Sequence, residues 1–194
     1  AKLVGEYLKR KDASVLPYPL IGFAVNDDSE VEAVTIPEKN HNRAIKILLG
    51  NSAAASNEHS YALKQLSHLA NDNIEIIAPL NYGGNENYVA SVIAQGKAIF
   101  ADKFIAYTKM LDKTAYDKLL QEVDLAVFAH NRQQGLYVAY AMLCQGKPMY
   151  LKQQTSSFSS LSNMGFTVYP TEQLHESSFT QLLKRTNNPD QNNK

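Results

Sequence analysis

The stretch with the most specific chemistry is FAHNRQQG, residues 128–135, which joins a buried apolar run to an apolar helical run. A helix start leaves backbone N–H groups free and carries a partial positive charge, so it can seat a phosphate. Arg132 adds a forked charge that suits phosphate oxygens, and Gly135 would let a ligand approach the backbone. The alternative is an arginine paired with a surface carboxylate and glutamines that merely favour a helix. The candidate ligand-binding residues here are Asn131, Arg132, Gln133, Gln134 and Gly135.

Residues 50–59, GNSAAASNEH, follow another buried apolar run and could contact the same ligand. Gly50 permits a tight turn, and Ser52 together with the loop N–H groups could donate hydrogen bonds to a phosphate. The spacing matches neither a Walker A loop nor the GxGxxG fingerprint. A mechanical alternative is that Ser56 or Asn57 simply caps the helix that follows.

Side chains with acid–base or stacking chemistry complete the candidate set. Glu58 and His59 could serve acid–base chemistry, but the sequence indicates no partner for either, so a solvated first helical turn is the favoured interpretation. In a third stretch, PLNYGGNEN, the ring of Tyr82 could stack on a base, although Asn-Tyr-Gly-Gly is also an ordinary turn. The candidate residues of these two stretches are Gly50, Asn51, Ser52, Asn57, Glu58, His59 and Tyr82.

Composition narrows the class of protein. Among 194 residues, Lys plus Arg and Asp plus Glu each number 19, so nothing in the net charge favours a nucleic-acid partner. The histidines lie apart and Cys144 is the only cysteine, so neither a metal site nor a cofactor is expected. Cys144 follows an apolar run, which predicts a packed, inert thiol in a reducing cytoplasm. No apolar stretch approaches the roughly 20 residues of a membrane span, and the first residues lack the apolar segment of a signal peptide.

The elements that must hold these residues alternate along the chain. Short β-branched and aromatic runs between turn residues predict strands, and apolar residues three and four apart predict helices. Strands are predicted at 45–49, 74–78, 104–108, 125–129, 149–151 and 167–169. Helices are predicted at 58–70, 87–95, 115–123, 134–145, 157–163 and 172–184. Before them we expect a helix at 3–10, an extended segment at 14–20 and a polar loop at 26–42.

This alternation predicts an α/β fold, a Rossmann-like parallel sheet with helices on both faces. In such sheets the ligand crevice lies outside the carboxyl ends of the strands, where all three candidate stretches fall. The Ser- and Gln-rich segment 153–160 is interpreted as a plain loop rather than a sugar contact.

As a series, ILLGNS…SNEH, PLNYGGNENYV and DLAVFAHNRQQG resemble the C-terminal domain of the TDP-N-acetylfucosamine:lipid II N-acetylfucosaminyltransferases. This 4-alpha-L-fucosyltransferase family acts in enterobacterial common antigen synthesis. The similarity runs over residues 45–174. It implies a GT-B fold, in which two Rossmann-like domains face a cleft and the C-terminal domain holds the nucleotide-sugar donor. It also implies transfer of N-acetylfucosamine, or a related deoxy-amino sugar, from TDP to a polyprenyl-diphosphate-linked saccharide at the cytoplasmic side of the bacterial inner membrane.

The resemblance further implies that the candidate residues line the donor site, and that the acceptor and the catalytic residues belong to an N-terminal domain. On this view residues 1–42 are an interdomain tail and linker, 43–185 the donor-binding domain and 186–194 a disordered tail. The protein would be peripheral at the membrane, and this part alone would be inactive. Tyr137 stands where the family tends to have a small residue, so the resemblance does not fix the shape of the sugar pocket or the exact sugar. The rival class is a non-enzymatic, flavodoxin-like nucleotide-binding or sensor module.

Overall fold

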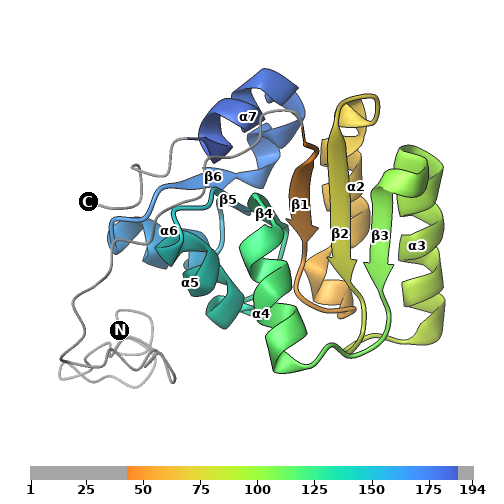
Figure 1. Ribbon diagram of the computed structural model, residues 1–194. Helices are drawn as coiled ribbons and strands as arrows, with labels where there is room; N and C mark the ends of the chain where they lie inside the picture. Colours follow the sequence, from red (N-terminus) through yellow and green to blue (C-terminus); the bar gives the residue numbers. More distant parts are fainter. Residues whose placement is uncertain (1–42, 188–194) are drawn as a thin grey trace, which may run out of the picture. The chain divides into compact units, whose positions relative to one another are not determined.

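Six short apolar runs form the strands of one sheet (Figure 1). The structure is a computed structural model and describes residues 43–187. Every strand pairing is parallel, and the strand order is β3-β2-β1-β4-β5-β6. The strands are β1 (Ile45–Leu49), β2 (Ile74–Pro79), β3 (Phe104–Tyr107), β4 (Leu125–Phe128), β5 (Met149–Leu151) and β6 (Val168–Pro170).

Helices follow the strands as the sequence pattern predicts. The α-helices are α2 (His59–Leu66), α3 (Glu86–Phe100), α4 (Lys113–Glu122), α5 (Leu136–Cys144), α6 (Ser156–Asn163) and α7 (Phe179–Thr186). Short 3-10 helices are η1 (Ala55–Asn57), η2 (Ser67–Leu69), η3 (Ala101–Lys103) and η4 (Thr171–Glu176). In the described residues, no helix is long and apolar enough to span a membrane.

Both faces of the sheet are buried, because successive strand residues point to opposite faces. Ile47 and Leu49 of β1 lie in one apolar cluster with α2, α3 and α7, while Leu48 lies in a second cluster with α4, α5 and α6. Figure 1 shows α2 and α3 on one face and α4 and α5 on the other. The predicted fold class, a parallel sheet with helices on both faces, is confirmed.

Three local predictions are wrong in whole or in part. The helix expected at 172–184 is two elements, η4 and α7, because Ser178 and Gln181 form a capping box that starts a new helix. The interpretation of 153–160 as a plain loop holds only as far as Thr155, because α6, the helix predicted at 157–163, begins at Ser156 behind a cap from Thr155. Cys144 is exposed rather than packed, because it is the last residue of α5, beyond the run that lies on the sheet.

The predictions for residues 3–10, 14–20 and 26–42 lie outside the described residues. The predicted tail, 186–194, overlaps the end of α7, where Thr186 is buried. Its remaining positions after residue 187 also lie outside the described range.

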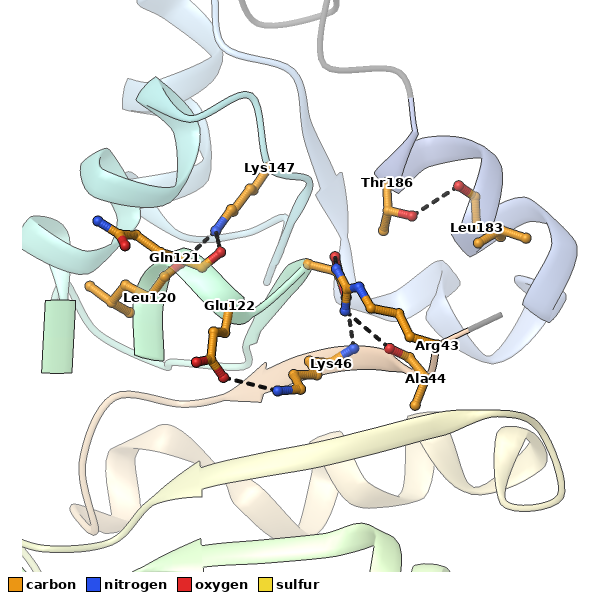
Figure 2. A network of polar contacts seen from close by, with 10 residues as sticks. Arg43, Ala44, Lys46, Leu120, Gln121, Glu122, Lys147, Leu183 and Thr186 are labelled. Carbon is orange, nitrogen blue, oxygen red and sulfur yellow. Dashed lines mark hydrogen bonds and ion pairs between the residues drawn. The ribbon is translucent and has the colours of Figure 1, made fainter. Parts of the chain in front are cut away.

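The amino edge of the sheet is held by a polar network (Figure 2). Asp124, just before β4, accepts two hydrogen bonds from the Arg43 guanidinium at 2.6 and 2.8 Å and one from the backbone N–H of Lys46 at 2.9 Å. Its side chain is only 4% exposed, so this pairing satisfies a buried carboxylate. Lys46 Nζ in turn pairs with Glu122 at 3.0 Å. These contacts therefore connect the beginning of β1 to the beginning of β4.

A buried ammonium group completes this edge. Lys147 Nζ donates to the backbone carbonyls of Leu120 and Gln121 in the last turn of α4, as Figure 2 shows. A cation there satisfies carbonyls that the helix end leaves open. The charges at the amino edge thus have structural partners, which directs the search for a ligand site to the carboxyl edge.

Candidate functional site

The candidate site lies where the strand order reverses. From β1 the chain crosses to β2 and β3 on one side, whereas β4, β5 and β6 follow on the other. Parallel sheets of this kind bind ligands outside the carboxyl ends of the strands at that point. The loops after β1 and β4, residues 50–58 and 129–135, leave the sheet side by side here.

Asn57 joins the two loops. Its Oδ1 accepts a hydrogen bond from the backbone N–H of Asn51 at 3.0 Å and lies 2.8 Å from Nε2 of His130. Its Nδ2 donates to Ser52 Oγ at 3.1 Å and to the carbonyl of Ala54 at 3.0 Å. The interpretation of Asn57 as a helix cap is therefore wrong: the side chain is 1% exposed and holds the loop from inside.

His59 lies beneath the loop and not in a solvated turn, which corrects the prediction. The side chain is fully buried, with Nδ1 3.0 Å from the hydroxyl of Tyr88, and burial lowers the pKa of His59 to about 4. A Cβ atom at Gly50 would lie 2.7 Å from Asn57 Oδ1 and 2.8 Å from His59 Nε2. Gly50 also has a φ of +66°, so close approach and backbone conformation both require glycine.

Glu58 connects three strand exits: the sequence indicated no partner for it, whereas the structure gives it two, with a third of the side chain still exposed. Its Oε1 accepts from Asn131 Nδ2 at 3.0 Å, and its Oε2 pairs with Lys152 Nζ, after β5, at 2.6 Å. Lys152 also lies over the ring of Tyr61, 4.9 Å from its centroid. Glu58 has a left-handed backbone, φ 50° and ψ 47°, which is strained for a residue with a side chain.

Arg132 is exposed and makes no ion pair within residues 43–187, so the carboxylate-paired alternative is wrong. Its Nε donates to Ser56 Oγ at 3.2 Å and to Gln134 Oε1 at 3.0 Å, and Ser56 Oγ donates to the same Oε1 at 2.6 Å. These bonds fix Nε and leave the end of the guanidinium toward solvent. Gln133 beside it is exposed.

The start of α5 is open. The helix begins at Leu136, two residues later than predicted, behind the N-cap residue Gly135 with φ 65°, and no side chain in the described range caps it. A Cβ at Gly135 would lie 3.0 Å from Cγ of Asn51, so the Asn51 amide lies against this helix start. Asn51 is 8% exposed; its Nδ2 donates to the Tyr82 hydroxyl at 3.2 Å, and within residues 43–187 its Oδ1 has no partner.

A pocket of about 390 Å³ opens beside Tyr82, between the exit of β2 and α3. Most of its lining side chains are apolar, and its polar groups include Asn81, Glu86 and Thr108. Asn81 Oδ1 is buried and has no hydrogen-bond partner among the described residues. The pocket is lined by Leu80, Asn81, Tyr82, Gly84, Glu86, Val89, Ala90, Ile93 and Thr108.

Except for the exposed Gln133, the structure brings the predicted residues after β1 and β4 into one connected cluster, and it adds three that were not among the candidate ligand-binding residues. His130, Ser56 and Lys152 hold Asn57, Arg132 and Glu58, respectively. All three lie at strand exits, which is the one sequence signal that marks them. Their roles depend on partners far away in the chain.

Residues 6–193 match the family described as 4-alpha-L-fucosyltransferase glycosyl transferase group 56. The chain belongs to this family. The resemblance drawn from the three motifs is thereby confirmed, and the class of protein is a glycosyltransferase rather than a flavodoxin-like module.

Solved structures show the same fold. The C-terminal domain of a glycosyl transferase group 1 protein, LpcC, from Francisella tularensis matches with a TM-score of 0.57 and 9% identity, covering 77% of this chain and 85% of that chain. The catalytic domain of a cholesterol-alpha-glucosyltransferase from Helicobacter pylori matches with a TM-score of 0.53 and 14% identity, covering 76% and 94%. The N-terminal domain of a Candida albicans trehalose-6-phosphate phosphatase matches with a TM-score of 0.53 and 12% identity, covering 78% of this chain and 38% of that chain. This chain thus spans well under half of that last chain, while the fold matches the Rossmann-like domains of GT-B glycosyltransferases.

Proposed function

We propose that residues 43–187 form the donor-binding domain of an enzyme that transfers N-acetylfucosamine, or a related deoxy-amino sugar, from TDP to a polyprenyl-diphosphate-linked saccharide. Membership of the fucosyltransferase family supports the reaction class. The observation that carries the donor site is the uncapped start of α5 beside the solvent-facing end of Arg132, at the reversal of the strand order.

The diphosphate would lie on the start of α5. The N–H groups of its first turn have no helical acceptors, and the helix dipole favours a negative group there. Arg132 supplies a charge whose Nε is already fixed by Ser56 and Gln134, which lowers the entropy lost on binding. The amide of Asn51 can turn over, because a Tyr82 hydroxyl can both donate and accept; its NH₂ would then point toward the anion.

The pocket beside Tyr82 suits the thymidine part of the donor. Asn81 Oδ1 and the Glu86 carboxylate can accept hydrogen bonds, and the pocket lining formed by residues 43–187 contains no cation. A neutral ring that donates a hydrogen bond, such as thymine with its one imide N–H, can satisfy one of these acceptors, while a phosphate would be repelled. The exposed ring of Tyr82 lines this pocket, and its hydroxyl contacts Asn51. This arrangement supports a donor that lies with its base in the pocket and its diphosphate beyond Tyr82, near Asn51.

A further domain would supply the acceptor site and the catalytic base. Transfer requires the acceptor hydroxyl to be held against the anomeric carbon, with a base within hydrogen-bond reach. We therefore propose that this domain alone transfers no sugar and that the parent enzyme meets its lipid-linked acceptor as a peripheral protein at the inner face of the bacterial inner membrane.

Calorimetric titration tests the donor assignment. TDP and TDP-glucose are expected to bind saturably, whereas ADP, flavin mononucleotide and NAD are expected to bind more weakly or not at all. Saturable flavin binding without TDP binding would overturn the proposal and would instead favour a flavodoxin-like binding module.

A further inference from the structure

Both ring nitrogens of His130 face hydrogen-bond acceptors. Nε2 lies 2.8 Å from Oδ1 of Asn57, and Nδ1 lies 3.2 Å from the backbone carbonyl of Gln134. The orientation of the Asn57 amide is fixed by its other bonds, since Oδ1 accepts from the Asn51 N–H and Nδ2 donates to a carbonyl at Ala54. A neutral imidazole has one N–H and cannot satisfy both acceptors, whereas an imidazolium has two.

The surroundings of His130 oppose this charge when no anion is present. Burial is the main cause that lowers the pKa of His130 to about 4, with smaller contributions from His59 of α2 and Arg132 of its own loop, while the Gln134 carbonyl acts in the opposite direction. The remaining charged group of the two loops, Glu58, pairs with Lys152 at the exit of β5. Hydrogen-bond geometry thus favours the imidazolium while the local charge disfavours it.

An anion on the start of α5 would change this balance. Gln134, whose carbonyl faces Nδ1, immediately precedes the N-cap residue Gly135. We propose that His130 takes up a proton from solvent when the donor diphosphate binds at the start of α5, and that the imidazolium then holds the loop 130–135 in its binding conformation. This rests on the proposed function. His130 is accordingly a positioning residue that acts through Asn57 and the Gln134 carbonyl.

Proton uptake and donor affinity are reciprocal. If the bound diphosphate raises the pKa of His130, then lowering the pH from that raised value toward the pKa of about 4 in the free protein must tighten donor binding, by at most about tenfold per pH unit. A loop held by a neutral histidine would show no such coupling.

The test uses TDP-glucose, because both of its phosphates are esterified and neither titrates near neutral pH. Titration at about pH 5.5 in buffers of different ionisation enthalpy measures the protons taken up on binding, in the range where histidine titrates. The whole chain is expected to take up a fraction of one proton. His130→Gln keeps an N–H for Asn57 but cannot titrate, so its uptake should vanish. His175→Gln, at an exposed histidine paired with Gln65, should retain the uptake.

A second measurement needs no variant. Carbon-13 chemical shifts of the histidine rings, followed through a pH titration with and without TDP-glucose, should show the pKa of one buried imidazole rising on binding. Binding without proton uptake, or equal uptake in His130→Gln, would overturn this inference and leave the donor assignment intact. Absence of any TDP-glucose binding would instead overturn the proposed function.

Discussion

Glu58 and Lys152 lie 94 positions apart and form an ion pair with 2.6 Å between Oε2 and Nζ. Glu58 enters α2 with a left-handed backbone; Ala101 is the other non-glycine residue of 43–187 with a positive φ, but its ψ of −125° lies outside the left-handed helical region. The pair connects the loop after β1 to the exit of β5, and Asn131 on the second carboxylate oxygen adds the loop after β4. A strained residue at the junction of three loops is typical of a site whose shape is fixed before the ligand arrives.

Comparing Glu58→Gly with Glu58→Ala separates the backbone strain from the contacts. Both variants lose the ion pair, which at 34% and 21% side-chain exposure is worth only about 0.2–1 kcal/mol. Only alanine keeps the steric penalty of the left-handed backbone, so Glu58→Gly is expected to be more stable by about 1 kcal/mol. Urea unfolding measures the difference, and equal stability of the two variants would contradict the assigned strain.

Gly50→Ala is expected to lower the free energy of unfolding by about 2–4 kcal/mol. The new Cβ would have φ +66° and would collide with Asn57 and His59, two buried side chains that hold the site. Chemical denaturation gives the magnitude. Gly165→Ala is the matched control: it also has a positive φ but open space around the new Cβ, so it should cost only about 1 kcal/mol. Similar losses in both variants would show that the collision contributes nothing.

Arg132→Ala is expected to weaken TDP binding by roughly tenfold to a hundredfold, the effect of losing one charge-assisted contact of about 1.5–3 kcal/mol. Thermal stability should change little, because the side chain is exposed and, within the described part of the chain, bonds only to Ser56 and Gln134. Calorimetry measures the affinity, with Lys184→Ala of α7 as a control that also removes one exposed cation. An affinity equal to that of the control would assign Arg132 a structural role only.

The strands could be predicted from sequence because their signal is local. The bounds predicted for β1 and β5 agree with the structure, and the remaining strands differ by one or two residues, since short apolar runs between turn residues mark them. The split between η4 and α7 could also have been found, because Ser178 followed by Gln181 is a capping-box pattern.

Side-chain roles at the site could not be predicted, because they depend on partners distant in sequence. From the sequence, Asn57 and Ser56 are candidate helix caps. In the structure Asn57 contacts His130, 73 positions away, and Ser56 contacts Arg132, 76 positions away. The sequence predicts His59 in a solvated helix start. The left-handed turn at Glu58 directs His59 inward instead, and such a turn is hard to predict where the residue is not glycine. Local sequence therefore predicted which loops come together at the carboxyl edge, but not the contacts between their side chains.

Acid is expected to destabilise the domain through its two buried histidines. Burial lowers the pKa of both His59 and His130 to about 4, whereas in the unfolded chain each returns to about 6.5. Between these values the unfolded state binds more protons than the folded state, so the free energy of unfolding falls as the pH falls. The slope reaches about 1.4 kcal/mol per pH unit for each histidine, and neither contributes a slope above about pH 7. Urea unfolding between about pH 4 and 8 measures the curve, and His59→Gln or His130→Gln should each remove about half of its slope. A flat curve, or greater stability in acid, would contradict the buried neutral state of these two side chains.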